Sequence, residues 1–161
     1  MNRVVVGAKS LNLARQELVC DCPSDPPEGL ALGYVNATTQ TPATFKVSAL
    51  YASGGCYSTA EDLFRWNEGL YNGRLLNATE LGKMLASHAT IVENGDGSGY
   101  GIELYDFAER KWAGNGGGPT GYSAIINRDL DDRLTLLLMG NQDMDIFTAN
   151  EYTLKYFFDT K

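Results

Sequence analysis

The sequence predicts an α+β fold, in which an antiparallel sheet packs against a helical hairpin and a C-terminal helix. Residues 58–88 carry apolar side chains at helical spacing. From residue 94 onward this period gives way to alternating or continuous apolar runs separated by turn residues. A helical pair followed by a run of strands, without strict alternation of the two, is typical of α+β folds.

The first expected helix begins at Ser58. Ser58 and Glu61 have the spacing of a capping box, in which a hydroxyl and a carboxylate satisfy free N–H groups at a helix start. We therefore interpret Ser58 as a helix cap and not as a nucleophile. Asn72-Gly73 ends the helix, because both residues favour helix termination. Its apolar positions are Leu63, Trp66 and Leu70.

A second helix, from Asn77 to near His88, completes the expected hairpin. Asn77 is a suitable cap, and Glu80 follows three residues later. His88 would lie at the helix C-terminus, where a partly cationic imidazole is favourable, so we expect a structural role for it. The apolar face of this helix consists of Leu81, Met84 and Leu85.

The sheet is expected to follow a turn at residues 94–99. Residues 100–107 alternate in the manner of a strand, and Lys111 to Ala113 would pair back against it. The next strand runs from Tyr122 to Asn127. These three segments predict an antiparallel arrangement, because short turns separate them.

An apolar strand and a closing helix complete the predicted fold. Asp129 to Asp132 would form a hairpin turn with solvated Asp131 and Asp132. Leu134 to Met139 is a nearly unbroken apolar run, which favours a central strand covered on both faces. Residues 145–158 place apolar and aromatic side chains on one helical face that can pack on the sheet.

The chain length is appropriate for a single domain, which we expect over residues 1–161. The N-terminal part would contain a strand, Arg3 to Val6, a segment of helical character, Leu11 to Val19, and an irregular arm rich in proline. The three expected parts are residues 1–47 (strand and irregular arm), 48–93 (helical hairpin) and 94–161 (antiparallel sheet with the closing helix).

The charge of the chain argues against several classes of function. Thirteen basic residues against 20 acidic ones give a net charge of −7. Such a surface repels both a phosphate backbone and an anionic membrane, so we expect neither nucleic-acid nor membrane binding. No apolar run approaches the roughly 20 residues that a membrane-spanning helix needs.

The cysteine pattern favours unpaired thiols in a reducing compartment. Cys20, Cys22 and Cys56 could join His88 in a zinc site, but their spacing matches no common zinc module. The apolar run from Val4 to Val6 is too short for a signal peptide. We therefore expect a cytoplasmic protein that needs no metal and no cofactor.

Residues 114–124 contain five glycines. Glycine at this density marks tight turns or a close approach of a ligand to the main chain. The segment includes a G-x-G-x-x-G string at Gly116, Gly118 and Gly121. A dinucleotide fingerprint must follow a strand and open a helix, whereas a strand follows here. Nucleotide binding is therefore not expected.

Four segments resemble, in the same order, motifs of serine β-lactamase-like proteins, which include class C β-lactamases, penicillin-binding proteins and related esterases. The segments read GGCYSTAEDL from Gly54, YGI from Tyr100, NGGGPTGYS from Asn115 and LTLLLMGN from Leu134. The resemblance covers roughly residues 30–158 and is to the C-terminal portion of the family. It implies an antiparallel sheet flanked by helices, with an active site beside a helical region, and relatives that are often exported.

The same resemblance implies catalysis by a Ser-x-x-Lys pair, a Y-x-N element and a basic-x-Gly motif. No serine of the chain is followed by lysine at that spacing. Tyr34-Val35-Asn36 spells Y-x-N, but it lies where the family has a structural segment. Asn115 stands where a lysine or histidine is expected, and its amide carries no charge.

These departures from the family pattern predict a truncated, catalytically inactive domain with no catalytic residue of its own. The alternative is a hydrolase whose nucleophile comes from a partner chain or from an unrecognised residue such as Ser53 or Cys56. A vestigial cleft for an unidentified small molecule would contain Asn115, Gly116, Gly117 and Tyr122.

A third hypothesis is a non-enzymatic interaction module. The N-terminal strands of the family would normally lie beside the final strand, so their loss would expose Leu134 to Met139. An exposed apolar edge recruits another strand. We therefore expect either a homodimer through this sheet edge or docking of Arg3 to Val6 against it.

Overall fold

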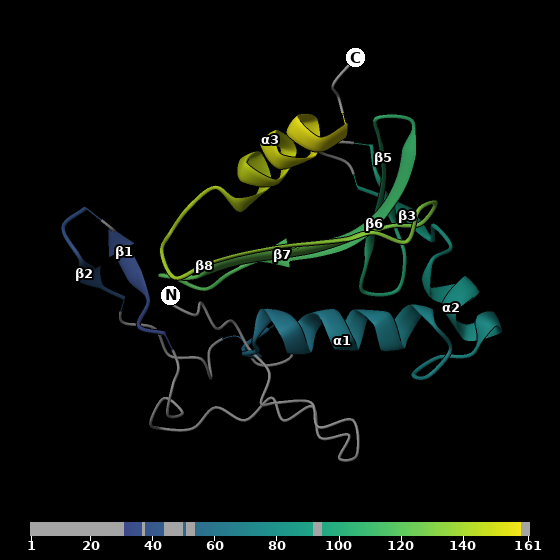
Figure 1. Cartoon of the computed structure of the whole chain (residues 1–161), viewed down its shortest axis with the longest axis horizontal. Coiled ribbons are helices and arrows are strands. Elements are labelled where there is room, and N and C mark those ends of the chain that lie inside the picture. The colour runs from purple at the N-terminus through teal and green to yellow at the C-terminus, as the bar shows by residue number, and fades with distance from the viewer. Residues whose placement is uncertain (1–30, 37, 44–49, 51–53, 92–94, 159–161) are drawn as a thin grey trace. The chain divides into compact units, whose positions relative to one another are not determined.

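A computed structural model describes residues 31–36, 38–43, 50, 54–91 and 95–158 (Figure 1). It confirms the predicted α+β fold, with a six-stranded antiparallel sheet, a small two-stranded sheet and three helices. In chain order the elements are β1 (Tyr34–Asn36), β2 (Thr41–Pro42), α1 (Ala60–Tyr71), α2 (Ala78–Met84), β3 (Ala89–Thr90), β4 (Gly97–Ser98), β5 (Glu103–Phe107), β6 (Arg110–Gly117), β7 (Ser123–Asp129), β8 (Thr135–Gly140) and α3 (Ile146–Phe158).

The residues group into two compact units. The first contains the described residues up to Trp66 together with Gly117–Ala124 and Met139–Asp145. The second contains Asn67–Gly116, Ile125–Leu138 and the residues from Ile146 onward. The expected single domain, with boundaries after residues 47 and 93, stays a prediction.

The large sheet has the strand order β3-β4-β5-β6-β7-β8, so each strand lies beside its neighbour in the chain. β5 and β6 form a hairpin in which Phe107 pairs with Arg110. Its two loop residues, Ala108 and Glu109, have φ values of 51° and 60°. This left-handed pair matches the right-handed twist of the flanking strands and makes a tight connection possible. The predicted return of Lys111 to Ala113 against residues 100–107 is confirmed.

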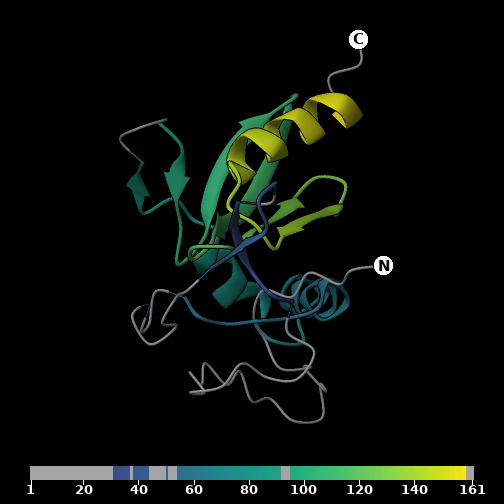
Figure 2. The same ribbon diagram turned by 90° about the vertical axis from the view of Figure 1, so that its left-hand side faces the viewer.

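In the second unit, helices cover both faces of the sheet (Figures 1 and 2). Asn127 and Arg128 are successive residues of β7 and therefore point to opposite faces. Asn127 Nδ2 donates a hydrogen bond to Asn150 Oδ1 of α3 at 2.7 Å. Arg128 forms an ion pair with Glu68 of α1 and donates to Thr135 Oγ1 at 2.7 Å. Thus α3 covers one face, and the C-terminal part of α1 covers the other.

The core of the second unit forms around Trp112 and Leu154, which are 1% and 2% exposed. The Trp112 ring meets Phe158 of α3 edge to face, with 5.4 Å between the ring centres. Burying side chains of this size contributes about 2–3 kcal/mol each. The predicted packing of the closing helix on the sheet is therefore confirmed.

The small sheet corrects the expectation that residues 21–47 are irregular. Tyr34 pairs with Pro42 across an antiparallel ladder, and the Asn36 side chain accepts a hydrogen bond from the Thr39 amide at 2.9 Å. An Asx turn of this kind reverses the chain without apolar periodicity, so the pattern gave no sign of strands. Pro42 is compatible with a strand because it lies in a two-residue strand at a sheet edge.

The first helix has a different cap from the one predicted. Helix α1 starts at Ala60, and Thr59 Oγ1 accepts a hydrogen bond from the Asp62 amide at 3.1 Å. Thr59 and Asp62 repeat the capping spacing one residue after Ser58 and Glu61, so the spacing alone could not select between them. The assignment of Ser58 as the cap is wrong. Ser58 is fully buried, and its hydroxyl has no hydrogen-bond partner within the described residues.

The second helix agrees with its prediction. Asn77 is the N-cap of α2, and its side chain accepts a hydrogen bond from the Glu80 amide at 3.0 Å. The helix ends at Met84 with Leu85 as its C-cap, so His88 lies three residues beyond it. The His88 ring still reaches back to the Lys83 carbonyl at 2.8 Å. It also stacks on Tyr100, with the ring centres 4.1 Å apart.

The position of the last strand is also a correction. β8 is the terminal strand of the sheet among the described residues, and every residue of it is half-buried. The central position expected for Leu134 to Met139 is therefore wrong. A continuous apolar run reports partial burial on both faces, but it does not report how many neighbours the strand has. The expected strand from Arg3 to Val6 lies outside the described residues.

Candidate functional site

The glycine-rich segment spans both units, and its first part closes the hairpin strand β6. Asn115 Nδ2 donates a hydrogen bond to the Gly101 carbonyl at 3.1 Å, while the residue itself is exposed. This bond fixes the uncharged amide at the position where the resemblance implies a basic side chain. A Cβ atom at Gly114 would lie 1.8 Å from Asn127 Oδ1, so only glycine allows β6 to approach β7 here.

The second part of the segment lies in the first unit. The Gly121 amide donates to Asp143 Oδ1 at 2.5 Å, and the φ value of Gly121 is +87°. Tyr122 is half-buried, and its hydroxyl donates to the Ala31 carbonyl at 2.8 Å. Its ring lies so close to Gly33 that a Cβ atom there would be 2.5 Å from it. The Tyr122 side chain therefore holds the chain segment around Gly33 in place.

The four residues predicted for a vestigial cleft divide between the two units. Asn115 and Gly116 line one pocket of the second unit. Gly117 and Tyr122 belong to the first unit and are not among the residues that line this pocket. Their common role in a cleft stays a prediction.

The candidate nucleophiles have different environments. Ser123 is buried, and its hydroxyl contacts the carbonyl oxygens of Gln142 and Met144, each at 3.2 Å. Cys56 is a half-buried free thiol. Ser53 lies outside the described residues. Lysines of the described part form ion pairs with carboxylates; these pairs are Lys83–Glu80, Lys111–Asp106 and Lys155–Glu151.

Within the residues that the structure describes, no group of three or more His, Cys, Asp or Glu side chains is arranged to hold a metal ion. Cys20 and Cys22 lie outside these residues. The same part of the chain contains no helix that is long and apolar enough to span a membrane.

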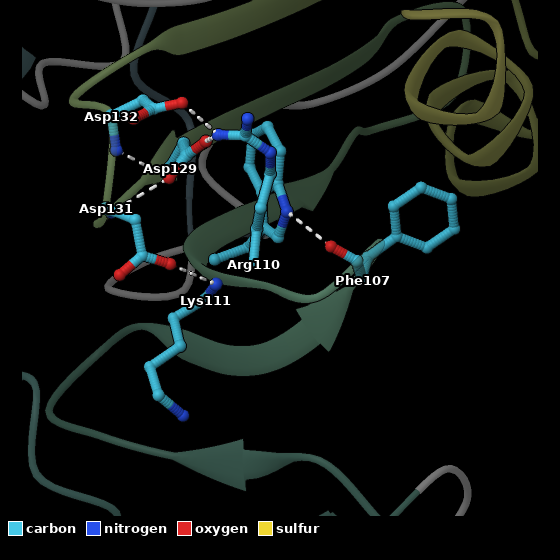
Figure 3. Close-up of polar contacts among 7 residues, drawn as sticks. Phe107, Arg110, Lys111, Asp129, Asp131 and Asp132 are labelled. Carbon is cyan, nitrogen blue, oxygen red and sulfur yellow. Dashed lines mark hydrogen bonds and ion pairs between the residues drawn. The ribbon is translucent and has the colours of Figure 1, made fainter. Parts of the chain in front are cut away.

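A polar cluster joins β6 to the turn between β7 and β8 (Figure 3). Arg110 forms ion pairs with Asp129, at 2.6 Å, and with Asp132. Asp129 Oδ1 also accepts hydrogen bonds from the amides of Asp131 and Asp132 at 2.8 and 3.0 Å. The Lys111 amide donates to Asp131 Oδ2 at 3.0 Å. The turn predicted as solvated therefore has exposed carboxylates that are also structurally engaged.

The pKa of Asp129 reflects this cluster. Burial by itself raises the pKa of this carboxyl, but hydrogen bonds from the Asp132 and Asp131 amides and from Arg110 lower it below the ordinary value. The pKa of Arg110 is raised, mainly by its hydrogen bonds to Asp132 and Asp129. A carboxylate held this strongly by its own fold is suited to a structural role and is a poor proton carrier.

A pocket of about 270 Å³ lies in the second unit and is lined by residues of β5, β6, β7 and α3. Glu103, Tyr105 and Phe107 of β5 all contribute to it, because alternate strand residues share one face. The sequence analysis placed these residues in a strand but not in a site. The i, i+2 spacing was the available signal, but α3 supplies the opposite wall, and only the fold brings it there.

No protein-family model and no curated protein sequence matches the chain. Solved structures do match it, among them a D-amino acid amidase from Ochrobactrum anthropi SV3 in complex with D-phenylalanine. That match has a TM-score of 0.67 and 24% identity, and it covers 83% of this chain and 45% of the amidase.

Two penicillin-binding proteins are similar as well. The octameric homologue from Pyrococcus abyssi has a TM-score of 0.69 at 20% identity, over 81% of this chain and 31% of that one. The protein from Bacillus halodurans has a TM-score of 0.64 at 25% identity, over 80% and 42%. This chain has part of the serine β-lactamase-like fold.

The serine β-lactamase-like fold confirms the resemblance drawn from the four sequence segments. The chain spans less than half the length of these relatives. At identities this low, the likeness establishes the fold and leaves the chemistry to be argued from the residues themselves.

Proposed function

We propose that this chain is a serine β-lactamase-like module that does not hydrolyse substrate by itself and acts by binding a ligand or a partner. The observation that carries the proposal is the absence of any Ser-x-x-Lys spacing in the 161 residues. Without a lysine beside it, a serine hydroxyl stays protonated and is a weak nucleophile at neutral pH.

The environment of Asn115 supports the same proposal. Its amide stands at the motif position where the family resemblance implies a cation, and it is held by the Gly101 carbonyl. An amide donates hydrogen bonds but supplies no charge for a substrate carboxylate. Two of the elements expected for acyl transfer are therefore replaced or missing in this chain.

The alternative, a hydrolase completed by another nucleophile, has one favourable observation. Cys56 is a free, half-buried thiol within the GGCYSTAEDL segment, two residues before Ser58. A thiol needs less activation than a hydroxyl because a few per cent of it is ionised at neutral pH. A partner chain could also supply the nucleophile.

One experiment separates these two functions. The purified chain is incubated with D-phenylalaninamide, nitrocefin and p-nitrophenyl acetate, and separately with a fluorophosphonate, a fluorescent penicillin and iodoacetamide. We expect no turnover above buffer and no fluorophosphonate or penicillin adduct by intact mass. Turnover that Cys56→Ser abolishes, or a penicillin adduct on any residue, would establish the hydrolase instead.

We further propose that the chain forms a homodimer through β8. Support comes from the terminal position of this strand in the described sheet and from its half-buried apolar side chains. Free N–H and C=O groups along such an edge pair readily with a second strand.

A further inference from the structure

The pocket between the sheet and α3 has walls of two kinds. Aromatic and aliphatic side chains form one part, and carboxylates and amides form the other. The apolar members are Tyr105, Phe107, Ile125, Phe147 and Leu154. The polar members are Asp96, Glu103, Asn115, Asn127, Asn150 and Glu151.

The charge of the pocket has a single sign. Three carboxylates line it, and none of its lining residues is Lys, Arg or His. Glu151 is partly neutralised by Lys155, one helical turn further on, at 2.5 Å. No salt bridge involves Glu103 in the described part of the chain. The pocket therefore repels anions and presents one carboxylate that has no cationic partner.

The aromatic walls add to the attraction for a cation. Phe147 is 52% exposed, so much of its ring is accessible. An ammonium group over an aromatic face is attracted by the negative face of the ring. The buried Tyr105 hydroxyl makes no hydrogen bond of normal geometry within the described residues. Burial raises the pKa of Tyr105 to about 12, while the neighbouring Asn150 opposes the rise, so the hydroxyl stays neutral.

We propose that this pocket binds a small organic cation, namely a primary amine carried by an aromatic body, with its ammonium at Glu103 and its ring among Phe107, Phe147 and Leu154. An aromatic amine satisfies both kinds of wall at once, because its ring enters the apolar part while its charge remains at the carboxylate. This site is separate from the acyl-transfer chemistry considered above and does not depend on the proposed function.

The test uses 2-phenylethylamine as the probe and 2-phenylethanol as its neutral counterpart of similar shape. Binding is followed by isothermal titration and by shifts of backbone amide resonances in an NMR titration. We expect the amine to bind in the high micromolar to millimolar range, with the largest shifts on β5 and the first turn of α3. The alcohol should bind at least about tenfold more weakly.

Two matched variants locate the charge. Glu103 and Asp106 both lie on β5, but Glu103 faces this pocket whereas Asp106 lines a different one. We expect Glu103→Gln to raise the Kd of the amine about tenfold and Asp106→Asn to change it less than about twofold.

Three results would overturn the proposal. These are no binding of the amine at millimolar concentration, equal binding of amine and alcohol, and equal weakening by both variants. The last result would mean that net charge alone attracts the amine. Circular dichroism of each variant shows whether it is folded, and the comparison of amine with alcohol on the unmodified chain tests the proposal without any variant.

Discussion

Asp129 is a buried carboxylate whose oxygens accept three hydrogen bonds, one from Arg110 and two from backbone amides of the following turn. It closes the turn between β7 and β8 and ties that turn to β6. The two ends of the Arg110–Asp129 pair are 19 residues apart, which no local sequence pattern connects. At the scale of single residues, this cluster holds the sheet together where the glycine-rich segment cannot.

Replacing Asp129 with Asn should lower the free energy of unfolding at neutral pH by about 2–4 kcal/mol, because the Arg110 charge loses a buried partner. Since the folded state lowers the pKa of Asp129, its contribution is complete above the ordinary carboxyl pKa of about 3.9 and is lost as pH falls through the lower folded value.

Urea unfolding of both proteins over a series of pH values measures this effect. The unmodified chain should lose more stability than Asp129→Asn does between about pH 5 and pH 2. Asp106→Asn removes an exposed carboxylate and should follow the unmodified chain. Parallel pH curves for the unmodified chain and Asp129→Asn would show that Asp129 is not the titrating group.

At the scale of elements, capping and turn residues decide where the helices and hairpins begin. Asn77 caps α2 as the sequence predicts, since no competing cap precedes it. The start of α1 has two overlapping capping patterns, and Thr59 is used while Ser58 is buried. The tight β5–β6 hairpin uses left-handed Ala108 and Glu109, residue types that give no turn signal.

The two neighbouring hydroxyls make a matched pair of variants. Thr59→Ala removes the hydrogen bond to the Asp62 amide and should cost about 1 kcal/mol of stability. Ser58→Ala removes a buried hydroxyl without a described partner and should be neutral or stabilising.

Thermal unfolding followed by circular dichroism compares these variants. A lower Tm for Thr59→Ala than for Ser58→Ala is expected. The reverse order would mean that Ser58 caps the helix in solution, as the sequence pattern first suggested.

At the scale of the whole molecule, the sheet ends at β8 among the described residues, and the fold matches less than half of each larger relative. An apolar terminal strand and an acidic chain of net charge −7 place different demands on association. Backbone pairing at the edge favours a dimer, whereas like charges on two copies oppose it. The balance between them depends on salt.

Analytical ultracentrifugation over a range of concentrations should show a reversible dimer that strengthens as salt is raised, because screening reduces the repulsion. Leu136→Lys places a charge on the β8 strand of each copy and should weaken dimerisation by about tenfold or more. Phe64→Lys changes an exposed apolar residue of α1 and serves as the control. A monomer at every concentration would exclude the edge as an interface.

The sequence by itself determined the α+β class, the helical pair, the β5–β6 return and the fold family. These follow from local periodicity, from the Asn77 cap and from four short motifs in a fixed order. It also showed that no serine has a lysine three residues on, which is a property of the chain and needs no coordinates.

Only the tertiary structure decided which of two caps starts α1, that β8 lies at the end of the described sheet, and that Arg110 pairs with Asp129. It also placed Glu103, Tyr105 and Phe107 opposite α3 to form a pocket. The physical reason is common to all four cases. Each depends on which distant segment occupies the neighbouring space, and a periodic pattern records that a face is buried but not what buries it.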